Sequence, residues 1–113
     1  MTKLFIYGTL KKGQCRNSAL EGQTFLGEVS TEPNYKLYRV SSFPGIVPVK
    51  DGIAIKGELW EVDARCLAAL DRIEGHPKLF KRDTIQLQGH SEPIESYFWQ
   101  GSTDLPEIGD CWK

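Results

Sequence analysis

Short runs of apolar and alternating residues recur along the chain and predict several β-strands. The first run, residues 4–7, is apolar and aromatic throughout and ends at Gly8, which is typical of a buried central strand that leads into a loop. Alternation predicts further strands at residues 35–40, 53–60, 84–87 and 94–99, with glycine and proline between them. The pattern therefore indicates a mainly β protein.

Helical periodicity is clear in one segment only. Asp63 is a good N-cap residue, Gly75 ends the pattern, and Pro77 prevents its continuation. A shorter helical piece is predicted near residues 17–20. Because parallel strands need a helix at each crossover, so few helices favour a curled or closed sheet. The length of 113 residues fits one domain, so we expect a single α+β domain over residues 1–113.

One charged residue breaks the helical pattern. Glu74 follows Leu67 and Leu70 in the apolar stripe, so a helix that buries these leucines also turns Glu74 inward. It lies in the last helical turn, where the partial negative charge of the helix terminus disfavours a carboxylate. Burial without a dedicated cation would raise its pKa towards neutrality, as a general acid/base requires.

Glu74 and the loop after the first strand each allow a structural alternative. Glu74 can extend to water or pair with a neighbouring cation at Arg72, Lys78 or Arg82. Gly8 can simply mark a turn or bulge. Alternatively, Gly8 lets the backbone N–H groups that follow it approach a carboxylate or an oxyanion.

Charge and cysteine usage narrow the class of protein. The net charge of −1, from 14 basic and 15 acidic side chains, lacks the positive field that nucleic-acid binding requires. No apolar stretch approaches the ~20 residues of a membrane span, and the N-terminal run is too short for a signal peptide. Cys15, Cys66 and Cys111 form no CxxC pair, which fits a reducing compartment. We expect a cytoplasmic protein with neither a nucleic-acid nor a membrane partner.

The sequence contains no pattern typical of metal or nucleophilic catalysis. His76 and His90 lie far apart, with no cysteine or acidic residue at ligand spacing and no evident orienting carboxylate. A Gly-x-Ser-x-Gly elbow is absent. We therefore expect no metal site and no cofactor.

Four motifs together resemble the γ-glutamylcyclotransferase-like family, in the expected order and over almost the whole chain. They are Tyr-Gly-Thr-Leu at residues 7–10, Phe-Pro-Gly at 43–45, Gly-Glu-Leu-Trp-Glu-Val-Asp at 57–63, and Leu-Asp-x-x-Glu-Gly at 70–75. The short chain, Pro77 and the Leu-Phe-Lys-Arg segment at 79–82 look like the γ-glutamylamine cyclotransferase branch and its small bacterial relatives. One departure is Phe80, at a position that is often tyrosine in that branch, so a hydroxyl contact with substrate would be lost here.

The resemblance implies a small mixed β-barrel, with one main helix and short helical pieces packed outside and a cavity at its mouth. It also implies that Tyr7, Gly8, Thr9 and Leu10 bind the substrate and that Glu74 is the catalytic acid/base. From their strand and loop positions, Phe43 and Tyr97 are further candidates to line the cavity, although such aromatic residues more often pack in a core.

The implied reaction converts a γ-glutamyl amine or γ-glutamyl amino acid to 5-oxoproline and a free amine. The α-amine attacks the γ-carbonyl of the same molecule, so no protein nucleophile, metal or cofactor is required. Two alternatives remain: a non-catalytic small-molecule-binding or regulatory protein on the same barrel, and removal of a γ-glutamyl protecting group from a biosynthetic intermediate. An ion-paired Glu74 would favour the binding protein, and a raised pKa the enzyme. The oligomeric state is open.

Overall fold

Seven β-strands and one α-helix make up the computed structural model, which describes every residue from Met1 to Lys113. The strands are β1 (Thr2–Ile6), β2 (Thr24–Ser30), β3 (Tyr35–Arg39), β4 (Pro44–Pro48), β5 (Lys56–Val62), β6 (Phe80–Thr84) and β7 (Glu95–Trp99). The helices are the short 3-10 helix η1 (Asn17–Leu20) and α1 (Ala64–Ile73). Neither α1, with its ten residues, nor the shorter η1 could span a membrane.

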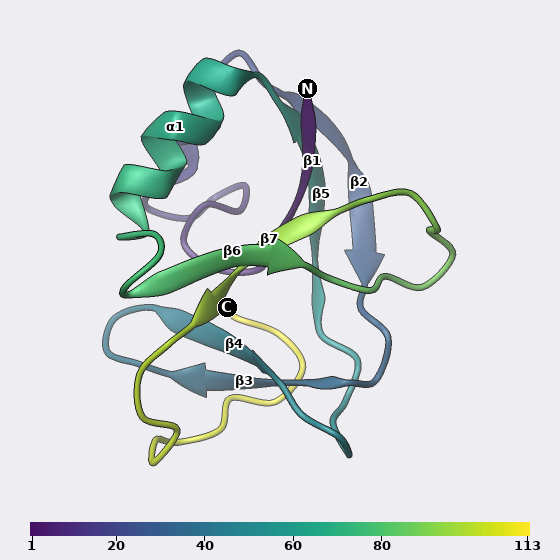
Figure 1. Cartoon of the computed structure of the whole chain (residues 1–113), viewed down its shortest axis with the longest axis vertical. Coiled ribbons are helices and arrows are strands. Elements are labelled where there is room, and N and C mark those ends of the chain that lie inside the picture. Colours follow the sequence, from purple (N-terminus) through teal and green to yellow (C-terminus); the bar gives the residue numbers. More distant parts are fainter.

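The strands form one mixed sheet in the order β2-β5-β1-β7-β4-β3, with β6 added to β7. β1 lies between antiparallel β5 and parallel β7, which confirms its predicted central position. β6 pairs along the whole of β7, whereas β1 pairs with β7 at Glu95 and β4 pairs with it at Phe98. β1 and β4 therefore diverge from β7, and in Figure 1 β3 and β4 run crosswise to β1 and β5.

Side chains of β1 point alternately into two hydrophobic clusters. The β3-side cluster consists of Phe5, Tyr7, Tyr35, Leu37, Ile46, Ile55, Leu59, Ile85, Leu87, Ile94, Phe98 and Trp112. The helix-side cluster consists of Leu4, Ile6, Leu10, Leu20, Trp60, Val62, Cys66, Leu70, Phe80 and Tyr97. The same sheet thus supplies both halves of the core, and α1 covers one of them.

The predicted helix is confirmed together with both of its boundaries. The Asp63 carboxylate accepts a hydrogen bond from Cys66 N at 2.7 Å, which satisfies one of the free N–H groups at the helix start. Gly75 has a φ of +66°, a left-handed conformation that ends the helix and that glycine adopts without strain. Leu70 is fully buried, and the helical piece predicted near residues 17–20 is η1.

The prediction of a strand at residues 84–87 is wrong. The strand observed there is β6, which ends at Thr84, although Ile85 and Leu87 are buried as their apolar character indicated. Most β6 side chains are polar, and the strand exists because it pairs with β7. The remaining predicted strands correspond to β1, β3, β5 and β7, while β2 and β4 were not predicted.

The prediction of one α+β domain with a single main helix is confirmed. β2 and β3 are the outer strands of the hydrogen-bonded order, so closure of the sheet into a barrel stays a prediction.

Candidate active site

A cavity lies between the loop that follows β1 and the C-terminal end of α1. It is lined by Phe5, Ile6, Tyr7, Gly8, Thr9, Leu10, Arg16, Phe43, Pro44, Ile73, Glu74, Leu79, Phe80 and Tyr97. Figure 1 shows the purple segment after β1 beside α1. All seven residues predicted from the sequence line this one cavity, namely Tyr7, Gly8, Thr9, Leu10, Phe43, Glu74 and Tyr97. Their chemical roles stay predictions.

Carbonyl groups of this loop accept hydrogen bonds from the protein, whereas its N–H groups have no partner there. The carbonyl oxygen of Thr9 accepts from Arg16 N at 2.9 Å, and that of Leu10 accepts from Asn17 Nδ2 at 2.9 Å. The N–H groups of Gly8, Thr9 and Leu10 donate to no group of the protein. Three successive unpaired N–H groups at a cavity form a site that suits a carboxylate or an oxyanion.

Close packing and the C-terminal tail hold the loop in place. A Cβ atom on Gly8 would lie 2.8 Å from Pro44 Cγ, so a larger residue there would push the loop and β4 apart. Lys11 Nζ donates to the carbonyl oxygen of Trp112 at 2.5 Å, and Trp112 Nε1 donates to Gln14 Oε1 at 3.3 Å. The C-terminal tail therefore holds the loop in place through the buried Trp112.

Glu74 lies directly after α1, half-buried, and its carboxylate makes no hydrogen bond or ion pair. Arg72 and Lys78 do not pair with it, and Arg82 pairs with other carboxylates instead. Burial raises the pKa of Glu74 to about 7, while the positive charge of Arg16 acts in the opposite direction. The ion-paired alternative is therefore wrong, and this carboxylate has the poise of a general acid/base at neutral pH.

The hydroxyl of Tyr7 is committed to the protein backbone. It donates to the carbonyl oxygen of Tyr97 at 2.6 Å and accepts from Ile46 N at 3.2 Å. Burial raises the pKa of Tyr7 strongly, although the hydrogen bond from Ile46 opposes this and the charge of Glu74 adds to it. Tyr7 therefore joins the loop to β7 and β4 and stays neutral.

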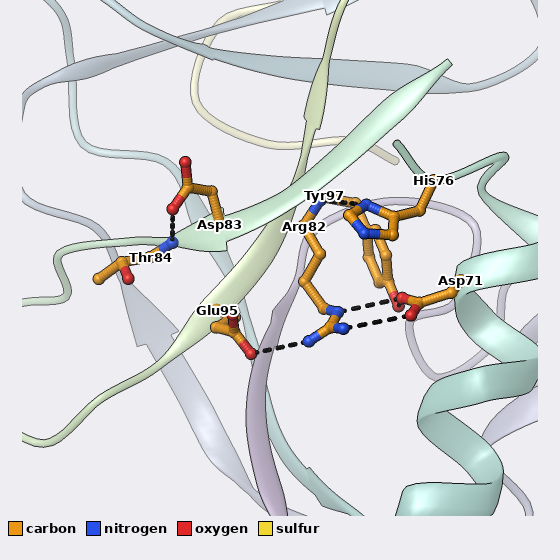
Figure 2. A network of polar contacts seen from close by, with 7 residues as sticks. All are labelled: Asp71, His76, Arg82, Asp83, Thr84, Glu95 and Tyr97. Carbon is orange, nitrogen blue, oxygen red and sulfur yellow. Dashed lines mark hydrogen bonds and ion pairs between the residues drawn. The ribbon is translucent and has the colours of Figure 1, made fainter. Parts of the chain in front are cut away.

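A polar network ties α1 to β6 and β7 (Figure 2). The guanidinium of Arg82 donates to both carboxylate oxygens of Asp71, at 3.0 and 3.2 Å, and to Glu95 at 3.1 Å. The hydroxyl of Tyr97 donates to Asp71 at 2.7 Å, and the backbone N–H of Arg82 donates to His76 Nδ1 at 2.9 Å. Burial raises the pKa of Asp71, but the hydrogen bonds from Tyr97 and Arg82 outweigh it and hold that pKa below its usual value. Asp71 is therefore ionised.

Sequence reasoning did not find this network, nor Arg16 as a cavity residue. Asp71 stands within the Leu-Asp-x-x-Glu motif, but its partners lie on strands that are distant in sequence. Arg16 is in an irregular loop, where neither helical nor strand periodicity indicates a direction. Phe80 lines the cavity and is buried, so a ring without a hydroxyl occupies this part of the wall.

The expectation that neither histidine has an orienting carboxylate needs a correction for His90. Its Nδ1 lies 3.2 Å from the carboxylate of Glu92, two residues further along the chain. This pair does not line the cavity. No group of three or more histidine, cysteine or acidic side chains is arranged to hold a metal ion.

Residues 4–113 match the family described as Gamma-glutamyl cyclotransferase, AIG2-like. The chain is 31% identical to the gamma-glutamylcyclotransferase family protein YtfP of Escherichia coli, over 96% of this chain and 94% of that protein. It is 32% identical to gamma-glutamylaminecyclotransferase A of Danio rerio, over 92% of this chain and 71% of that protein.

The crystal structure of an AIG2-like protein from Mus musculus has the same fold. It superposes with a TM-score of 0.87 at 26% identity and covers 100% of this chain and 88% of the mouse chain. The family match spans β1 to the C-terminal tail, so it includes both the loop of free N–H groups and Glu74. The chain therefore belongs to the AIG2-like gamma-glutamyl cyclotransferase family.

Proposed function

We propose that this protein converts a γ-glutamyl amine or γ-glutamyl amino acid to 5-oxoproline and a free amine. The observation that carries the proposal is that two features line the same cavity. They are the carboxylate of Glu74, which has no ion-pair or hydrogen-bond partner and a pKa of about 7, and the free backbone N–H groups of the loop after β1. Membership in a family of gamma-glutamyl cyclotransferases supports the same reaction.

Glu74 moves the protons that ring closure requires. As a carboxylate it accepts a proton from the α-ammonium group of the substrate, and the resulting amine attacks the γ-carbonyl carbon to form the new C–N bond. As a carboxylic acid it then donates that proton to the leaving nitrogen, and the old C–N bond breaks. The second proton of the α-nitrogen follows by the same route, so the products are a neutral lactam N–H and an ammonium ion. One group can act in both directions because its pKa lies near neutral pH.

The free N–H groups of Gly8, Thr9 and Leu10 supply the electrostatic part of catalysis. They would hold either the α-carboxylate of the substrate or the oxyanion that develops on the γ-carbonyl oxygen. The walls of the cavity hold the substrate in the bent conformation in which its own amine reaches the carbonyl. Because nucleophile and electrophile belong to one molecule, the reaction requires no covalent bond between substrate and protein.

The test is mass-spectrometric detection of 5-oxoproline from a panel of γ-glutamyl amino acids and γ-glutamyl amines. We expect Glu74→Gln to lower turnover by about a hundredfold to ten-thousandfold, because it removes the positioned proton carrier. Glu28→Gln, which changes an exposed glutamate on β2 outside the cavity, is the matched control and should keep full activity. Equal turnover in Glu74→Gln and wild type would refute the assigned role. No product from the wild type would favour a non-catalytic binding protein.

A further inference from the structure

Arg16 is a charged residue of the cavity to which the reaction above gives no task. It supplies the only lysine or arginine side chain in the lining. It is exposed, and its guanidinium makes no ion pair and no hydrogen bond with the protein. Its backbone is nevertheless fixed, because Arg16 N donates to the carbonyl oxygen of Thr9 at 2.9 Å. A free guanidinium is thus anchored next to the loop of free N–H groups.

Exposure divides the lining into an inner part and a rim. Tyr97 is 3% exposed and Glu74 is half-buried, whereas Ile73 and Leu79 are 40% and 46% exposed. Arg16 belongs with this exposed rim. The rim therefore combines two apolar side chains with one unpaired cation.

The reaction determines which part of a substrate meets each region. The α-amine and the γ-carbonyl must lie near Glu74, because they exchange protons with it. The free N–H groups beside this position offer partners for the α-carboxylate or the oxyanion. The leaving amine is the part of the substrate that extends outward, so it meets Ile73, Leu79 and Arg16 at the rim.

We propose that Arg16 is a specificity-determining residue that selects substrates whose leaving amine carries a carboxylate. The guanidinium fork matches a carboxylate with two parallel hydrogen bonds, and Ile73 and Leu79 contact an apolar portion of the same leaving group. This inference rests on the proposed function. It predicts a preference for γ-glutamyl conjugates of apolar amino acids over conjugates of the corresponding simple amines.

Two substrates that differ only in this carboxylate test the inference. They are γ-glutamyl-leucine and γ-glutamyl-3-methylbutylamine, compared by kcat/KM for release of 5-oxoproline. We expect the wild type to prefer the leucine conjugate by about five- to tenfold, as befits a charge-assisted contact at a partly exposed site. R16Q should lose this preference by slowing about five- to tenfold more on γ-glutamyl-leucine than on the amine conjugate. The ratio of the two rates is the readout, because loss of the Arg16 charge also acts on Glu74 and does so equally with both substrates. R16K should retain part of the preference, because lysine keeps the positive charge but lacks the two parallel N–H donors of the guanidinium.

R65Q removes the same charge from an exposed position of α1 that does not line the cavity, and it should behave as the wild type. An equal loss by R16Q on both substrates would assign Arg16 to the shared γ-glutamyl group or to the pKa of Glu74, and would overturn the inference. An unchanged preference in R16Q would also overturn it. Both of these results leave the proposed cyclotransferase reaction standing. Absence of 5-oxoproline from the wild type with every substrate would instead overturn the proposed function and, with it, this inference.

Discussion

The carboxylate of Glu74 lies where the folded protein disfavours its charge. It is half-buried, it follows the last residue of α1, and no cation pairs with it. The helix terminus adds a partial negative charge at the same place. Burial therefore raises the pKa to about 7 from 4.5, and the folded protein binds this proton more tightly than the unfolded chain does.

This raised pKa gives the stability of the protein a pH dependence that Glu74→Gln removes. The contribution of the protonated carboxyl is complete below about pH 4.5 and is lost as the pH rises to about 7. We compare the free energy of unfolding of Glu74→Gln with that of the wild type at two pH values. Between about pH 4 and about pH 8 we expect this difference to change by about 1–3 kcal/mol in favour of the variant. Urea unfolding at both pH values measures this. A wild-type minus variant difference that does not change with pH would contradict the assigned pKa.

The sequence identified Glu74 because a carboxylate is unfavourable both in an apolar helical stripe and at a helix C-terminus. Arg16 stands at no such unfavourable position, so the sequence did not single it out. A carboxylate in an apolar stripe and at a helix C-terminus is visible without coordinates, because helical geometry determines which side chains share a face. An arginine in a loop is acceptable anywhere on a surface. Only the path of the loop after β1 places it at the cavity.

At the scale of elements, the position of Glu74 depends on how the end of α1 is attached to the sheet. Asp71 lies three residues before Glu74. Its carboxylate accepts hydrogen bonds from the guanidinium of Arg82 on β6 and from the hydroxyl of Tyr97 on β7 (Figure 2). The cavity opens next to this attachment, since Tyr97 lines it. The network therefore acts as a clamp that holds the end of α1, next to Glu74, against β6 and β7.

We expect Asp71→Asn to lower kcat by about tenfold or more, because small displacements of a proton-transfer group slow the reaction strongly. It should also lower the free energy of unfolding by about 1–3 kcal/mol, since Arg82 keeps its charge but loses its main partner. A displaced Glu74 would in addition shift the acidic limb of the pH-rate profile. The control is Asp83→Asn, next to Arg82 on β6. Asp83 has an exposed ion pair with Lys81 at 4.0 Å and accepts a hydrogen bond from Thr84 N at 2.8 Å, which the amide oxygen of asparagine also accepts, so this change should alter none of these values. A loss of stability without change in kcat or in the pH profile would make the clamp purely structural.

The strands illustrate which elements local patterns can predict. β1 is a continuous apolar run and β3, β5 and β7 carry apolar alternation, and the sequence indicated each of them. β6 is mostly polar and exists through its pairing with β7, and β2 is irregular, with a register shift between Phe25 and Gly27. β4 begins and ends with proline, which normally marks a turn. Strands of this kind are decided by their partners.

At the scale of the whole molecule, one sheet supports two hydrophobic clusters. β1 contributes to both of them, with Phe5 in the β3-side cluster and Leu4 in the helix-side cluster. Neither cluster is complete without the shared strands, so neither half of the molecule has a core of its own. This arrangement favours a single cooperative unfolding unit over residues 1–113.

Matched substitutions in the two clusters test this cooperativity. Leu37 and Leu70 are both fully buried, and we expect alanine at either position to lower the free energy of unfolding by about 2–5 kcal/mol. Each variant should show one urea transition with the wild-type slope and a lower midpoint, detected alike by tryptophan fluorescence and by circular dichroism. Leu26→Ala, at a side chain that is 44% exposed, should have an effect below about 1 kcal/mol. Two separate transitions in either core variant would contradict the single-unit interpretation.

The sequence by itself determined the boundaries of α1, the central first strand, the α+β class and the inward position of Glu74. These features follow from caps, glycine and proline positions, and periodicity, all of which act over a few neighbouring residues. The tertiary structure decided the divergence of β1 and β4 from β7, the Asp71–Arg82 network and the place of Arg16 at the rim of the cavity. These depend on contacts between segments far apart in the chain, and such contacts have no local signature because each partner alone is an ordinary polar or loop residue.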